Sequence, residues 1–124
     1  MKKKKLKSLK NLKDEAWDLQ SKHIRQEGAD DDGFTHCYTC GIRKHWKELQ
    51  AGHYIHNRLD FERNNLRKQC VRCNKWLRGN LGVYGERLIK EIGLETVEKM
   101  RLYSYQKGNN YTRLEVNEII KTYK

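Results

Sequence analysis

The four cysteines of the sequence stand in two pairs, Cys37-x-x-Cys40 and Cys70-x-x-Cys73. Two sulfur atoms at this spacing can bind one ion, and Gly41 after the second cysteine suits the tight turn that this requires. Four thiolates suit tetrahedral Zn(II) and leave no coordination position for an activated water. The spacing therefore predicts a closed structural zinc site that contributes free energy of folding. Disulfides, an iron–sulfur cluster or a redox pair are the competing interpretations.

A second motif lies between and after these pairs. The run Gln-Ala-Gly-His-Tyr at 50–54 lies between the pairs, Asn-Asn-Leu at 64–66 precedes the second pair, and Asn74 follows it at once. This order resembles the HNH (His-metal finger) endonucleases that carry a zinc staple. Their pattern is a Cys-x-x-Cys, a strand that ends in the general-base His, a loop, an Asn-Leu strand, and a Cys-x-x-Cys followed by His or Asn. The resemblance implies a small α+β fold, a ββα-metal (HNH) finger with a four-cysteine zinc site, flanked by N- and C-terminal helices.

Phosphodiester hydrolysis explains why these residue types are needed. The reaction requires a water molecule deprotonated near neutral pH, and His is the side chain suited to that task. It also requires a cation on the scissile phosphate, for which an Asn oxygen is a suitable hard ligand. We therefore predict His53 as general base, Asn74 as ligand of a catalytic Mg(II) or Mn(II), and Asn65 as organiser of the loop that faces His53. Asn64 is a near-equal candidate for the third role.

One position departs from the HNH pattern. Many HNH enzymes carry Asp or His just before the base as a second metal ligand, whereas this sequence has Gly52. Gly-His is similar to the Asp-Arg-Gly-His motif of the non-specific nucleases with the same finger, which hold their ion with a single Asn and waters. We therefore expect a one-Asn site built on Asn74. Other oxygen and nitrogen donors nearby in the sequence are His56, Asp60, Glu62 and Asn80.

Short motifs between residues 17 and 100 narrow the resemblance. They are 21–26, 37–41, 51–54, 61–65 and 69–74, followed by Leu77, Gly79, Asn80, Tyr84 and Leu88. Together they resemble the lambdoid phage NinG/Rap recombination proteins, and the zinc layout is also similar to the phage resolvase endonuclease VII. The resemblance implies a structure-dependent endonuclease that cuts branched DNA, such as Holliday junctions and D-loops, in the cytoplasm of a phage-infected bacterium. It also implies a homodimer, because a four-way junction needs two cuts related by symmetry, and possible contacts with recombination proteins.

The charge of the chain favours a polyanionic partner. The net charge is +11 and the sequence pI is about 9.6, which is typical of a small domain that binds nucleic acid. Basic residues crowd the stretch that carries the motif, and we predict phosphate contacts from four of them. These are Arg58, Arg67, Lys75 and Arg78. The sequence shows no row of base-reading side chains, so binding should depend on salt and on the shape of a branch point.

Several classes of protein are disfavoured. No segment approaches the roughly 20 apolar residues of a membrane span, and the lysine-rich N-terminus lacks the apolar stretch of a signal peptide. We therefore expect no membrane partner and a reducing compartment, which disfavours disulfides. Two other functions stay open. One is an HNH enzyme that nicks duplex DNA, and the other is a non-catalytic zinc protein that binds DNA as a recombination accessory.

This chemistry requires strands and helices that position the side chains. We expect extended segments at 34–37, 46–55 and 66–70, with a polar basic loop at 56–64. The middle one would place Leu49, Ala51 and His53 on one face. Helices are expected at 8–26, from Cys73 to an interruption near Gly79, at 83–92, at 94–103 and, after a Thr112/Glu115 capping box, at 112–123. The predicted parts are a basic N-terminal helical arm at 1–27, the zinc-stapled HNH nuclease core at 28–93, and C-terminal helices at 94–124.

Overall fold

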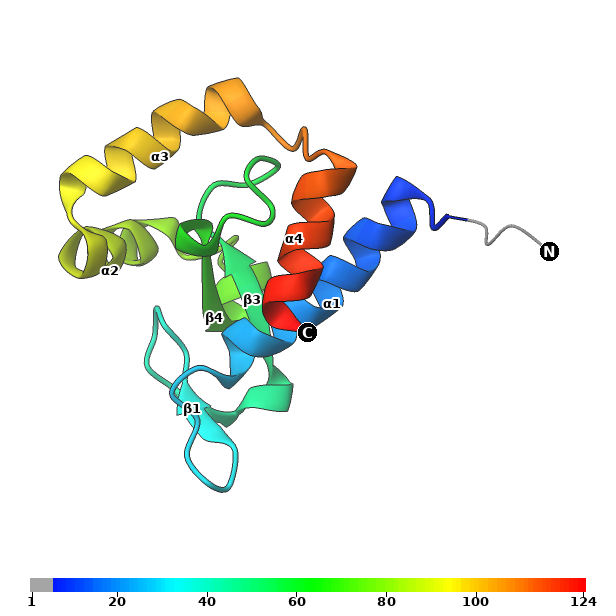
Figure 1. The fold of residues 1–124 in the computed structure, drawn as a ribbon. Helices are drawn as coiled ribbons and strands as arrows, with labels where there is room; N and C mark the ends of the chain where they lie inside the picture. Colours follow the sequence, from blue (N-terminus) through cyan, green and yellow to red (C-terminus); the bar gives the residue numbers. More distant parts are fainter. Residues whose placement is uncertain (1–5) are drawn as a thin grey trace.

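The computed structural model describes residues 6–124, and the lysine run Lys2–Lys5 lies outside the described residues. Within this range the chain forms two small antiparallel sheets and four α-helices (Figure 1). The strands are β1 Phe34–His36, β2 Arg43–His45, β3 Leu49–His53 and β4 Leu66–Cys70. The helices are α1 Leu9–Gln26, α2 Leu81–Ile92, α3 Leu94–Lys107 and α4 Arg113–Tyr123. The predicted small α+β fold is therefore confirmed.

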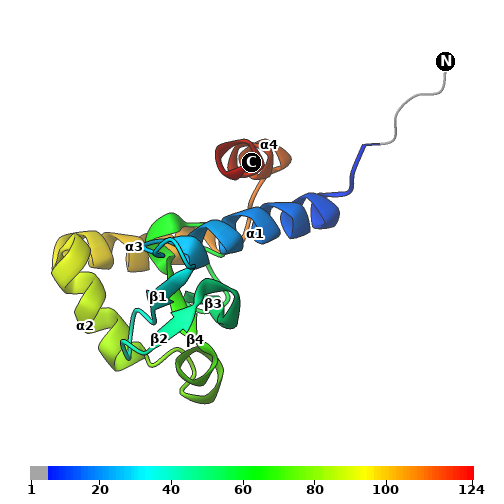
Figure 2. The ribbon, with the colours of Figure 1, turned by 90° about the horizontal axis from the view of Figure 1, so that it is seen from below.

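Helix α1 is the central packing element. It begins at the N-cap Ser8, whose side chain accepts a hydrogen bond from the Asn11 amide. It lies between α4 and the β3–β4 sheet, so the helix predicted as an arm contacts both (Figure 2). The buried row is Leu12, Ala16, Gln20 and Ile24. The spacing of the sequence predicts that the helix buries Leu9, Leu12, Ala16, Leu19 and His23. This prediction is wrong at Leu9 and His23, which are exposed, because the contact follows steps of four rather than alternating threes and fours.

The β3–β4 hairpin has two faces with different roles. Its register pairs Gly52 with Arg67 and His53 with Leu66. Leu49, Ala51 and His53 share one face, as predicted, and Ala51 and Leu66 pack there against Ile24 and Trp17 of α1. The opposite face carries Gln50, Gly52, Arg67 and Gln69, and it is covered by α2 and the turn that leads into it. His53 therefore lies on the α1 side of the sheet.

The segment after β4 differs from the prediction. Arg72–Trp76 is a π-helical turn rather than the start of an α-helix, and three residues with left-handed φ, Arg78, Gly79 and Asn80, end it before α2. The turn is wide because it must place Cys73 beside the other cysteines and Asn74 beside β3. Strand β2 and the short 3-10 helices Trp46–Glu48 and Arg63–Asn65 were not predicted either.

A second core lies between α2, α3 and the loop after β3. Its buried members are Ile55, Leu59, Tyr84, Leu88, Val97 and Met100. Helix α4 begins with the predicted capping box of Thr112 and Glu115. The sequence predicts Leu114, Ile119, Ile120 and Tyr123 as its apolar side. The buried side chains are Val116 and Ile120, whereas Leu114 is 71% exposed. None of the described helices is long and apolar enough to cross a membrane.

Candidate functional site

The four cysteines come together at one point. Their sulfur atoms all lie within 4.8 Å of one another, and Cys40 Sγ is 3.7 Å from Cys70 Sγ. That separation far exceeds the ~2.05 Å of a disulfide. It matches the edge of about 3.8 Å that a tetrahedron has when each sulfur is about 2.3 Å from zinc. The geometry and the donor set therefore fit the predicted structural Zn(II), and they disfavour disulfide pairing.

The cysteine site joins the two hairpins. Cys37 and Cys40 lie in the turn between β1 and β2, whereas Cys70 ends β4 and Cys73 lies in the π-helical turn. Gly41 in the first turn has a φ of 78°, a left-handed conformation that suits glycine. A metal ion here would hold the β1–β2 hairpin and the Arg72–Trp76 turn against β4.

Hydrogen bonds around Cys37 favour its ligand form. Burial opposes ionisation of this thiol, but donors from the Cys40 backbone and the Thr39 side chain outweigh burial and lower its pKa to about 6. Burial instead raises the pKa of Cys40 to about 12. Four crowded thiols cannot all ionise without a cation between them, so the site requires a metal for its full charge.

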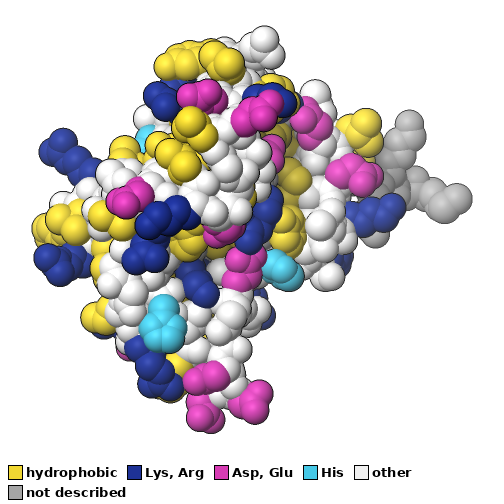
Figure 3. Space-filling view, turned by 90° about the vertical axis from the view of Figure 1, so that its left-hand side faces the viewer, with side chains coloured by type: hydrophobic (Ala, Val, Ile, Leu, Met, Phe, Trp, Pro, Cys, Tyr) yellow, Lys and Arg dark blue, Asp and Glu magenta, His cyan; other side chains and the backbone are white. Residues whose placement is uncertain are grey.

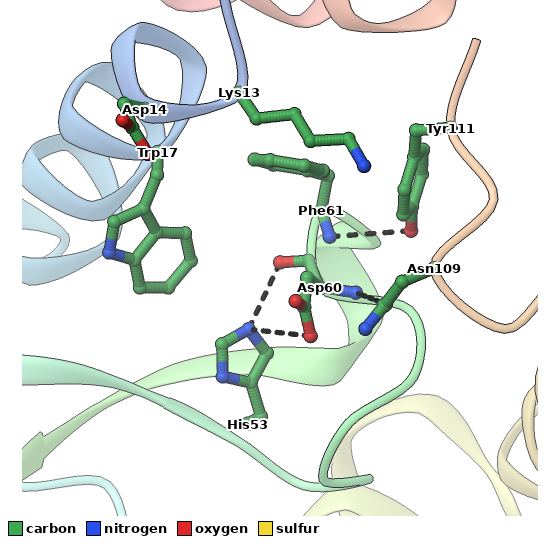
Figure 4. Close-up of a pocket in the computed structure, with 8 residues that line it drawn as sticks. All are labelled: Lys13, Asp14, Trp17, His53, Asp60, Phe61, Asn109 and Tyr111. Carbon is green, nitrogen blue, oxygen red and sulfur yellow. Dashed lines mark hydrogen bonds and ion pairs between the residues drawn. The ribbon is translucent and has the colours of Figure 1, made fainter. Parts of the chain in front are cut away.

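His53 ends β3 and lines two pockets, of which the one beside α1, drawn in Figure 4, is also lined by Trp17 and Phe61. Its Nε2 lies 3.0 Å from the backbone carbonyl of Asp60 and 3.8 Å from the Asp60 carboxylate (Figure 4). A carbonyl only accepts, so Nε2 carries the proton and the other ring nitrogen is left to act as a base. The Trp17 ring stacks on the imidazole with centroids 5.0 Å apart and planes at 16°. Both contacts fix the orientation of the ring.

The carbonyl that holds His53 belongs to a loop organised by Asn65. This side chain is fully buried. Its Oδ1 accepts from the Ile55 amide at 2.7 Å, and its Nδ2 lies within 3.0 to 3.2 Å of three carbonyls. Those carbonyls belong to Ile55, Arg58 and Leu59. Leu59 has a φ of 55°, which a branched residue adopts only when its surroundings hold it there.

Replacing Asn65 by Ala is expected to lower the free energy of unfolding by about 2 to 4 kcal/mol. Each lost hydrogen bond contributes about 1 kcal/mol, and the buried groups left without a partner add to the loss. Urea denaturation of the zinc-loaded protein measures this change. Asn64→Ala is the matched control, because within residues 6–124 the Asn64 side chain makes no hydrogen bond. Equal effects of the two substitutions would show that Asn65 does not organise the loop.

Asn74 and His53 line the second of these pockets, which is open and distinct from the one in Figure 4. The cavity has a volume of about 360 Å³, and its lining is His53, His56, Asn57, Asp60 and Asn74. Asn74 Nδ2 donates to Gln50 Oε1 at 2.8 Å, which turns the amide oxygen of Asn74 towards Gly52. The donors here are amide and carboxylate oxygens and imidazole nitrogens, which are acceptable ligands for a hard divalent ion. Of the alternative donors named from the sequence, His56 and Asp60 lie in this pocket.

The four predicted phosphate contacts divide into two groups. Lys75 and Arg78 are exposed, and Arg58 is partly exposed with its guanidinium 4.2 Å from the centre of the Tyr105 ring. Arg67 is instead only 4% exposed, and it donates to the Glu91 carboxylate at 2.7 Å and to the Leu66 carbonyl at 2.6 Å. Its charge is therefore already paired inside the protein. This placement does not fit a phosphate contact, and we leave Arg67 out of the proposed surface.

Three residues near the site carry roles that the sequence prediction missed. Trp17 stacks on His53, and Asp60, which the sequence suggested only as a metal donor, holds the His53 ring with its carbonyl and its carboxylate. Gln69 packs against Gly52 from the neighbouring strand. The contact of Trp17 joins residues 36 positions apart and depends on how α1 crosses the sheet. The β3–β4 register could have placed Gln69 opposite Gln50, because both strands were predicted.

The fold and the site define a small α+β protein whose hairpins meet at a four-cysteine site able to hold a metal ion. The family model described as Bacteriophage Lambda NinG protein matches residues 1–124, so the chain belongs to this phage family. Two similar proteins are both named Protein ninG. That of Salmonella phage P22 is 34% identical over 70% of this chain and 43% of the relative. That of Escherichia phage lambda is 38% identical over 52% of this chain and 33% of the relative. The chain thus matches less than half the length of these relatives. No solved structure matches it.

Proposed function

We propose that this protein is a metal-dependent endonuclease of the HNH type that cuts branched DNA, such as Holliday junctions and D-loops, during phage recombination in the host cytoplasm. The observation that carries the proposal is the position of His53. The Asp60 carbonyl holds Nε2 of His53, and the His53 side chain lines a pocket together with Asn74, the proposed oxygen ligand. A fixed imidazole tautomer that faces an open cavity is what a general base requires, whereas a histidine with a purely structural role requires neither.

The chemistry follows from these side chains. The unprotonated ring nitrogen of His53 accepts a proton from a water molecule, and the Asp60 carbonyl stabilises the imidazolium that forms. Asn74, together with waters, would hold a divalent ion such as Mg(II) or Mn(II). When bound, that ion supplies positive charge to the scissile phosphate. Zinc bound by the four cysteines would have a structural role, because no coordination position is left for water.

The proposed DNA surface uses the basic residues that are free of internal pairing. Within residues 6–124, no ion pair involves Arg58, Lys75 or Arg78. Figure 3 shows that Lys and Arg side chains are scattered among hydrophobic and acidic ones on one face rather than gathered in a single block. Binding would therefore rest on separate phosphate contacts, and shape would supply the preference for branches. A homodimer would supply the two cuts that a four-way junction needs.

A labelled four-way junction is expected to be cut at least about ten-fold faster than its linear duplex arms in Mg(II) or Mn(II). Distorting an intact duplex costs about 1 to 6 kcal/mol, and ten-fold in rate corresponds to about 1.4 kcal/mol. Gel analysis of both substrates under single-turnover conditions measures the ratio. Equal rates would favour a duplex-nicking HNH enzyme over a junction nuclease.

A second candidate is a non-catalytic zinc protein that binds DNA as a recombination accessory. Gly52 favours it, because this position supplies no metal ligand before His53. Junction binding without cutting, in Mg(II) and in Mn(II), would support this alternative and contradict the nuclease.

A further inference from the structure

The space beside Gly52 is filled by a side chain from the neighbouring strand. A Cβ atom built on Gly52 would lie 1.8 Å from Gln69 Oε1 and 3.0 Å from Asn74 Oδ1. The first distance is far below any real contact, so Gln69 Oε1 occupies the place where the side chain of residue 52 would begin. The two amide oxygens are no farther apart than the sum of these distances, 4.8 Å.

The Gln69 amide can point in only one direction. Its Nε2 lies 2.8 Å from the Gly79 carbonyl, which can only accept a hydrogen bond. It also lies 3.2 Å from Thr39 Oγ1, and that hydroxyl is 3.4 Å from Cys37 Sγ. A flipped amide would place two oxygens against each other at Gly79. The oxygen of Gln69 therefore points towards Gly52 and Asn74.

This oxygen has no hydrogen-bond partner. Gln69 is fully buried, and its Oε1 is one of two buried side-chain atoms without a partner among the described residues. Asn74 Oδ1 likewise accepts no hydrogen bond from any residue within 6–124, since the amide nitrogen makes the Gln50 contact. The buried Gln69 oxygen without a donor costs free energy, and the Asn74 oxygen that converges on it adds repulsion unless a positive group lies between them.

We infer that Gln69 Oε1 is the second protein oxygen of the divalent-cation site, in place of the ligand that HNH enzymes carry just before the general base. The inference rests on the proposed function for the location of the cation at Asn74. A hard ion whose ligand oxygens lie about 2.1 Å from it holds two of those oxygens about 3 to 4 Å apart. That separation is below the 4.8 Å upper limit on the distance between Gln69 Oε1 and Asn74 Oδ1. Gln69 of β4 thus provides the second oxygen ligand that Gly52 of β3 cannot provide.

Mn(II) binding to the zinc-loaded full chain, followed by electron paramagnetic resonance of the free ion, tests the inference without DNA. Gln69→Leu is expected to weaken Mn(II) binding about ten-fold or more. Gln69→Glu keeps the length of the side chain and adds charge. Its second oxygen replaces Nε2 against the Gly79 carbonyl, so the variant is expected to be less stable than wild type but, when folded, to bind Mn(II) more tightly. Asn74→Ala should lose binding.

Gln20→Leu is the matched control. Gln20 is also fully buried in α1 with an unpartnered Oε1, and its Nε2 donates to the Phe61 carbonyl. This variant should lose comparable packing and bind Mn(II) as wild type does. If Gln69→Leu does not fold, Gln69→Glu decides, because binding no tighter than wild type would overturn the inference. Wild-type affinity in a folded Gln69→Leu would overturn it too.

The two proposals fail separately in this design. A chain that binds Mn(II) through Gln69 but cuts no DNA would contradict the nuclease and keep the ligand assignment. A chain that cuts DNA, with Mn(II) affinity indifferent to Gln69, would contradict the ligand assignment alone.

Discussion

Replacing His53 by Ala is expected to lower the rate of DNA cutting by about 10² to 10⁴-fold, which is the usual contribution of a general base. Zinc content and DNA affinity should stay close to those of wild type. The side chain lies at the end of β3 and is partly exposed to the pocket, and its ring contacts Asp60 and Trp17. Its removal therefore leaves the four cysteines and the two cores in place. Single-turnover cutting of a four-way junction measures the rate.

His56→Ala is the matched control for this variant. His56 is exposed and lines the pocket that His53 shares with Asn74, but within residues 6–124 it makes no hydrogen bond to the Asp60 carbonyl. We expect a much smaller effect on cutting from His56→Ala than from His53→Ala. Loss of zinc, folding or DNA binding in His53→Ala would show that His53 is a structural residue. Equal loss of cutting in both variants would leave the general base unassigned between them.

The parts of the site that follow from local pattern could be predicted from the sequence. The cysteine cluster depends on two short spacings and a turn glycine, and the structure brings all four sulfurs together. The face shared by Leu49, Ala51 and His53 follows from strand alternation. The capping box of α4 is encoded within four residues. These features can be predicted from nearby residues alone, because they depend little on how distant segments of the chain pack together.

The features that could not be predicted depend on distant contacts. Arg67 looks like a phosphate ligand in the sequence, but Glu91 lies 24 residues away and reaches it only through the packing of α2 on β4. Its guanidinium, although buried, stays charged: burial would lower its pKa, and the Glu91 hydrogen bond outweighs that and raises it. The π-helical turn is likewise set by the cysteine site rather than by propensity.

The four-cysteine site and the pocket that contains His53 and Asn74 are connected through the same chain segment. The Arg72–Trp76 turn carries both Cys73 and Asn74, so a metal that fixes the turn would also fix the Asn74 side chain in the pocket that it shares with His53. Gln69 adds a second connection, because its amide contacts Thr39 near Cys37 and its oxygen lies against Gly52. Loss of the metal should therefore disturb the pocket together with the cysteine site.

Replacing Cys70 by Ser is expected to abolish zinc binding and to unfold the protein at room temperature. Structural zinc in small domains binds with an apparent free energy of about 10 to 16 kcal/mol at pH 7. A domain of this kind has a total stability of only about 5 to 15 kcal/mol. Cys70 ends β4, is 6% exposed, and accepts a hydrogen bond from the Cys73 amide, so both halves of the site depend on its sulfur. Circular dichroism and metal analysis of the purified variant measure the two losses.

Val71→Ser is the matched control, because Val71 is the neighbouring residue, is 39% exposed, and offers no sulfur. It should keep one zinc and a cooperative thermal transition. Wild-type protein treated with a chelator should behave as Cys70→Ser does, and added Zn(II) should refold the wild type alone. A Cys70→Ser protein that is folded without zinc would contradict the structural role of the metal. The cores around α1 and α2 would then suffice to stabilise the fold, and the four cysteines would need another explanation.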